Sequence, residues 1–95
     1  MANVVVTIRI MPESPETDLS KIESEAKKLI AQFNERGEEQ EFRVTETPIA
    51  FGLKALDIIF VMDEDKGSTE ELEKQIAALD GAASAETTDV RRAVG

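Results

Sequence analysis

The chain is 95 residues long and carries 11 lysines and arginines against 20 aspartates and glutamates, a net charge of −9. This length suits one domain spanning residues 1–95, since single domains mostly run from about 50 to 250 residues, and the negative charge disfavours nucleic acid as a partner. The absence of cysteine and histidine excludes disulfides, thiolate metal sites and the commonest general base. We therefore expect no enzymatic chemistry, no cofactor and no metal ion.

The first predicted element is a strand over residues 3–11, where β-branched side chains alternate in two rows. No basic patch precedes this segment, and Thr7 and Arg9 interrupt its apolar character, so it does not match a signal peptide. No apolar run approaches the length of about 18 residues that a membrane helix needs. We expect a cytoplasmic chain that does not engage a membrane. The apolar row of this strand consists of Val4, Val6, Ile8 and Ile10.

A helix is predicted over residues 18–36, after two prolines end the strand. Its apolar side chains recur every three or four positions and form one stripe. Asp18 or Ser20 is expected to cap its start, and Gly37 is expected to end it. The stripe consists of Leu19, Ile22, Ala26, Leu29, Ile30 and Phe33.

Two further strands are predicted in the middle of the chain. Residues 42–45 alternate but are mostly polar, which suits the edge of a sheet. Residues 55–62 form the most apolar segment of the chain, which suits a central strand. The row of this strand that we expect to face the core consists of Leu56, Ile58, Phe60 and Met62.

The second predicted helix begins where Ser68 and Glu71 fit a capping box, and Gly81 is expected to end it. Residues 83–92 have weak strand propensity, but the remaining sheet edge needs a cover, so we predict a fourth strand there. The side chains of the second helix expected to face inward are Leu72, Ile76 and Leu79.

The order of elements is β-α-β repeated twice, which predicts an α+β fold, a ferredoxin-like βαββαβ sandwich. We expect both helices to cover one face of a four-stranded antiparallel sheet, because each helix stripe and each apolar strand is one-sided. Right-handed crossovers then place strands 3–11 and 55–62 in the centre. The polar strand 42–45 and the weak strand 83–92 are left at the two edges.

Two places fall outside this periodic pattern. Phe51 lies between Ala50 and Gly52 in a predicted loop. Its side chain either folds back onto the core or projects as an anchor for another protein, since aromatic side chains on short loops make effective interface hot spots. The segment DVRR at residues 89–92 is neutral to basic in an acidic chain, and it is either a frayed tail or a functional segment.

Three segments of the chain are distinctive: VVVTIRIMPESPETDL near the start, PIAFGLKALDIIFVMDEDKG in the middle and TTDVRR near the end. Together they resemble the archaeal elongation factor 1-beta family, which is related to the exchange domain of the eukaryotic factor. The resemblance covers nearly the whole chain, and PIAFGLKAL is its most specific part. It implies a guanine nucleotide exchange factor for elongation factor 1-alpha, the GTPase that delivers aminoacyl-tRNA to the ribosome.

The resemblance also implies which residues bind this partner. Phe51 matches the loop aromatic with which the family docks on the GTPase. The eukaryotic domain uses a lysine near its C-terminal end to enter the magnesium site, whereas this chain has Arg91 and Arg92 followed by residues 93–95 without a lysine. The partner-binding residues expected from the match are Ile49, Phe51, Gly52, Lys54, Asp89, Arg91 and Arg92.

A second hypothesis comes from a different class of protein. A ferredoxin-like fold alone fixes no function, so a small-ligand-binding or oligomerising regulatory module remains the alternative to an exchange factor. An exchange factor is expected to be a monomer when free and to bind a nucleotide-free GTPase. A regulatory module is expected to bind a small molecule such as an amino acid.

Overall fold

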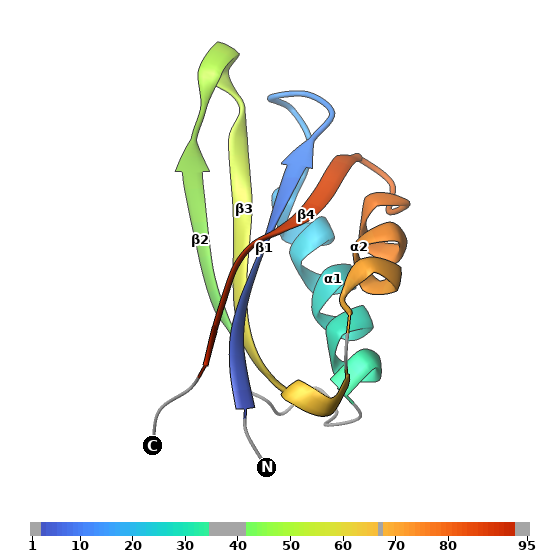
Figure 1. Ribbon diagram of the computed structural model, residues 1–95. Coiled ribbons are helices and arrows are strands. Elements are labelled where there is room, and N and C mark those ends of the chain that lie inside the picture. The colour runs from blue at the N-terminus through green and yellow to red at the C-terminus, as the bar shows by residue number, and fades with distance from the viewer. Residues whose placement is uncertain (1–2, 35–41, 67, 93–95) are drawn as a thin grey trace.

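The computed structural model describes residues 3–34, 42–66 and 68–92. It contains one four-stranded antiparallel sheet with two α-helices packed on one face (Figure 1). The elements are β1 (Asn3–Pro12), α1 (Leu19–Asn34), β2 (Arg43–Pro48), η1 (Ala50–Gly52), β3 (Lys54–Asp63), η2 (Glu64–Lys66), α2 (Glu70–Ala77) and β4 (Ala82–Arg92). The strand order β2-β3-β1-β4 confirms the predicted ferredoxin-like sandwich, with the two apolar strands in the centre.

The core lies between the helices and the covered face of the sheet, as the one-sided patterns predict. Val4, Leu29, Phe33 and Leu79, which were expected inside, are half-buried and pack against its rim. The buried apolar side chains of the core cluster are Val6, Ile8, Ile10, Ile22, Ala26, Ile30, Leu56, Ile58, Phe60, Met62, Leu72, Ile76 and Ala82.

The first helix begins as predicted. The Asp18 carboxylate accepts hydrogen bonds from the backbone N–H groups of Ser20, at 3.0 Å, and Lys21, at 3.4 Å. Asp18 therefore satisfies donors that the first turn of a helix leaves without intrahelical partners. The predicted end of this helix at Gly37 lies outside the described residues.

The capping box predicted at the second helix is wrong. The helix begins at Glu70 with Thr69 in the N-cap position, and Ser68 Oγ accepts a hydrogen bond from the Glu70 N–H instead, at 3.1 Å. The Thr69 hydroxyl forms a 2.8 Å hydrogen bond with the Thr87 hydroxyl on β4. The Thr69 side chain is therefore engaged with β4, and the helix begins one residue later than a cap at Ser68 predicts.

The second helix also ends earlier than predicted, at Ala77, four positions before Gly81. Gly81 has a φ of 91°, and a Cβ atom there would lie 2.9 Å from Thr17 Cγ2. The Gly81 carbonyl accepts a 2.9 Å hydrogen bond from the Glu13 N–H. The glycine thus permits the close approach between the start of β4 and the loop that joins β1 to α1.

Candidate protein-docking site

The edge strand β2 and the central strand β3 form a hairpin whose tip lies at one end of the sheet (Figure 1). The Ile49 N–H donates a 2.8 Å hydrogen bond to the Leu53 carbonyl, and the Leu53 N–H donates a 3.3 Å bond back to Ala50. These two bonds close the tip around Ala50, Phe51 and Gly52. The loop is therefore a defined structure, and its three central residues are held between two strands.

Phe51 projects from this tip into solvent, with 93% of the residue exposed. Its backbone is left-handed, with φ 62° and ψ 30°, a conformation that costs a residue with a Cβ atom about 1–2 kcal/mol. Gly52 follows with a φ of 74°, so two successive residues turn the chain the same way. The alternative in which Phe51 folds back onto the core is therefore wrong.

The other hairpin residues expected from the sequence lie around this ring. Ile49 is half-buried, whereas Gly52 and Lys54 are exposed. A pocket of about 310 Å³ opens between the hairpin and the loop before α1, and Gly52 and Lys54 line one of its walls. The structure thus brings together four of the seven candidate residues at one end of the molecule.

The three remaining candidates lie at the other end of the sheet, where β4 finishes (Figure 1). Arg91 pairs with Val5 of β1, which in turn pairs with Val61 of β3. Val61 lies seven residues along β3 from Lys54, a separation of about 23 Å in an extended strand. The hairpin tip and the C-terminal arginines therefore form two separate groups of candidate residues.

Both arginines carry ion pairs yet remain open to solvent. Arg91 contacts Asp89 at 2.9 Å and Arg92 contacts Glu64 at 3.4 Å, with 78% and 73% of the arginine side chains exposed. Backbone pairing of β4 with β1 continues through Arg92, so residues 89–92 do not form a frayed tail. Residues 93–95 lie outside the described residues.

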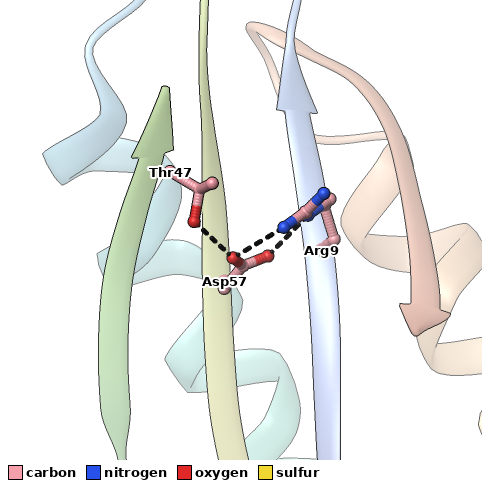
Figure 2. A network of polar contacts seen from close by, with 3 residues as sticks. All are labelled: Arg9, Thr47 and Asp57. Carbon is pink, nitrogen blue, oxygen red and sulfur yellow. Dashed lines mark hydrogen bonds and ion pairs between the residues drawn. The ribbon is translucent and has the colours of Figure 1, made fainter. Parts of the chain in front are cut away.

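A polar network on the uncovered face of the sheet was not found from the sequence. Figure 2 shows Asp57 between Arg9 and Thr47. Arg9 Nε donates to Asp57 Oδ1 at 2.8 Å and Arg9 Nη2 donates to Oδ2 at 3.1 Å, while Thr47 Oγ1 donates to Oδ2 at 2.8 Å. The network joins β2, β3 and β1. The sequence feature that could have predicted it is the pair of opposite charges, Arg9 and Asp57, because each lies in the outward-facing row of its strand.

These hydrogen bonds change the proton affinity of the network. The bond from Arg9 lowers the pKa of Asp57 below its ordinary value despite the opposing effect of burial, and the bond from Thr47 lowers it further. The bond to Asp57 raises the pKa of Arg9. Asp57 therefore stays ionised to a lower pH in the folded chain than in the unfolded chain.

We expect this network to contribute stability at neutral pH and to lose that contribution in acid. The unfolded chain protonates Asp57 near the ordinary carboxyl pKa of about 4, whereas the folded chain does so only at lower pH. The contribution is complete above the ordinary value and disappears as pH falls through the depressed one. Urea unfolding at about pH 7 and about pH 3 should show a smaller stability difference between wild type and Asp57→Asn in acid. An unchanged difference would contradict the lowered pKa.

Residues 3–34, 42–66 and 68–92 contain no helix that is long and apolar enough to cross a membrane. In the same part of the chain, no three acidic side chains lie close enough together to hold a metal ion.

Comparison with known proteins identifies the family. Residues 5–93 match the EF-1 guanine nucleotide exchange domain. The elongation factor 1-beta of Methanobrevibacter smithii is 45% identical over 97% of this chain and 98% of its own length. Those of Methanosphaera stadtmanae and Methanothermobacter thermautotrophicus, with the same coverage, are 42% and 39% identical. The chain therefore belongs to the family of EF-1 guanine nucleotide exchange domains, and nucleotide exchange in translation elongation is its role.

Proposed function

We propose that the chain promotes the release of GDP from elongation factor 1-alpha in the cytoplasm, and that it docks on this GTPase through Phe51. The observation that carries the proposal is the exposed phenyl ring on a closed hairpin tip. The family to which the chain belongs favours nucleotide exchange over the alternative of a small-ligand-binding or oligomerising module.

The hairpin tip suits docking because its shape exists before the partner arrives. An anchor that is already held in its bound conformation loses little conformational entropy on binding. Burial of a whole aromatic side chain in a pocket of the partner then supplies one of the large, localised contributions that dominate protein interfaces. The left-handed backbone at Phe51 keeps the ring away from the core and available to the GTPase.

Exchange itself requires binding and no covalent chemistry. A factor that binds the nucleotide-free GTPase more tightly than the loaded one must weaken nucleotide binding by the same ratio. Faster release by about a thousandfold corresponds to a barrier lower by about 4 kcal/mol. A few contacts of the kind that Phe51 offers together supply this energy. The proposed factor is therefore not an enzyme and needs no cofactor, and we propose that it is a monomer when free.

The C-terminal arginines form the second part of the proposed interface. Measured along the strands, they lie about 23 Å from the start of β3, so a GTPase bound at both places must extend along the length of the sheet. Arg91 and Arg92 are exposed cations on a chain of net charge −9. We assign them, with Asp89, the contact nearest the nucleotide and its magnesium ion.

A release assay tests the proposed activity directly. Fluorescent GDP is loaded on elongation factor 1-alpha and chased with excess unlabelled nucleotide, with and without the chain. We expect the chain to accelerate fluorescence loss in proportion to its concentration. A release rate that stays equal to the rate without the chain, even at a large excess of the chain, would refute the exchange activity. Heat released on titration with amino acids would support the regulatory module instead.

A further inference from the structure

The tip of the β2–β3 hairpin is not held in place by core packing. From Thr45 to Lys54 every residue is exposed or half-buried and none packs against the core cluster, and the first buried residues of β3 are Ala55 and Leu56. Backbone bonds close the loop and pair its two strands, so any further interaction that fixes the direction in which Phe51 projects must lie outside the core.

The Asp57 network supplies this interaction at the base of the tip. Thr47 lies opposite Ala55, in the second-last pair of the β2–β3 ladder before the turn. Its hydroxyl reaches diagonally across to Asp57 at 2.8 Å. Asp57 is itself held by two hydrogen bonds from Arg9 on β1. The edge strand that leads into the tip is thus tied through side chains to both central strands.

We propose that Thr47 and Asp57 are positioning residues for Phe51: their hydrogen bond, anchored by Arg9, fixes the hairpin tip in the orientation that docks on the GTPase. The proposal rests on the docking function assigned to Phe51 above. In this proposal, the Asp57 network on the uncovered face of the sheet contributes to docking through Phe51 at the end of the sheet.

Hydrogen exchange of the free protein tests the positioning step without any partner. Thr47→Val removes the hydroxyl and leaves Asp57 paired with Arg9. We expect the amides of Ile49 and Leu53, which close the tip, to exchange about tenfold faster, the change expected when a hydrogen bond to a charged group is lost. Amides in the centre of β1 should keep their rates. Unchanged exchange at the tip, or an equal increase at both places, would overturn the proposal.

Binding measurements test the consequence for docking. We expect Thr47→Val to weaken binding to nucleotide-free elongation factor 1-alpha about fivefold, within the range of coupling between neighbouring residues. Thr47→Ser, which keeps the hydroxyl, should bind like wild type. Thr45→Val is the matched control, because Thr45 points to the same side of β2 and makes no side-chain hydrogen bond within the described part of the chain. Equal losses from both valine variants would contradict a specific role for Thr47.

A double-mutant cycle separates this proposal from the docking function itself. In a Phe51→Ala background, Thr47→Val should change affinity by less than about twofold, because there is no ring left to position. If Phe51→Ala alone leaves affinity unchanged, the docking function is refuted. If Phe51→Ala weakens binding but Thr47→Val does not, the docking function stands and the positioning role is refuted.

Discussion

Replacing Phe51 with alanine should weaken binding to elongation factor 1-alpha by about 2 kcal/mol or more, the usual threshold for an interface hot spot. The ring contributes nothing to the core because 93% of the residue is exposed in the free chain. Its removal therefore creates no cavity, and we expect the melting temperature to stay within experimental error of the wild-type value. The entire effect should fall on binding and on the rate of GDP release.

Thermal melting, calorimetric titration and GDP release on the same Phe51→Ala preparation provide the measurement. Phe51→Leu offers a graded control, since it shortens the side chain but keeps it apolar, and its affinity should lie between those of the wild type and the alanine variant. Full affinity and full exchange activity in Phe51→Ala would remove the ring from the interface. A fall in melting temperature with normal exchange would show that the ring stabilises the fold instead.

Phe60→Ala should have the opposite effect and lower the free energy of unfolding by about 3–5 kcal/mol. Phe60 is 1% exposed and lies in the core cluster on β3, opposite Val6 of β1. Truncation leaves a cavity between the sheet and the helices that neighbouring side chains fill only in part. In a domain of this size, such a loss is a large share of a total stability of about 5–15 kcal/mol.

Urea unfolding of Phe60→Ala measures this loss, with Phe60→Leu as a smaller truncation at the same position. Phe51→Ala is the matched control, because it deletes the same atoms from an exposed site. At temperatures where Phe60→Ala remains folded, its affinity for elongation factor 1-alpha should equal that of the wild type. A loss of stability below about 1 kcal/mol would be too small for a buried phenylalanine and would contradict the assigned position of Phe60.

The topology could be predicted because the strongest signals in the sequence are one-sided. The alternation in residues 3–11 and 55–62 assigns one row of each strand to the core, and their greater apolarity places both strands in the centre. β4 is harder to predict from the sequence, since its residues have weak propensity for a strand. It forms over 11 residues because pairing with β1 satisfies backbone groups on both strands, and this outweighs propensity.

The candidate site could be predicted only in part. Whether Phe51 faces the core or solvent depends on a left-handed φ at residue 51, which side-chain periodicity does not report. The pairing of Arg9 with Asp57 depends on the register between β1 and β3, and a shift of one residue would put the two charges on opposite faces. The separation of Phe51 from Arg91 could be predicted from the topology. β4 is antiparallel to β1 and ends beside the start of β1, whereas β3 begins beside the end of β1.

The two proposed contacts lie at opposite ends of one sheet, so insertions into its central strand can change the distance between them only in fixed steps. β3 has neighbours on both sides, so one inserted residue would exchange its core-facing and outward-facing side chains. Only an insertion of two residues keeps each side chain of the strand on its own face, and such an insertion lengthens the strand by about 7 Å. β4, at the edge, already accommodates a register shift opposite Thr7 and Ile8. Small changes in the distance between the two contacts can therefore arise only in the edge strand or in the hairpin loop. The length of the central strand can change only by two residues at a time.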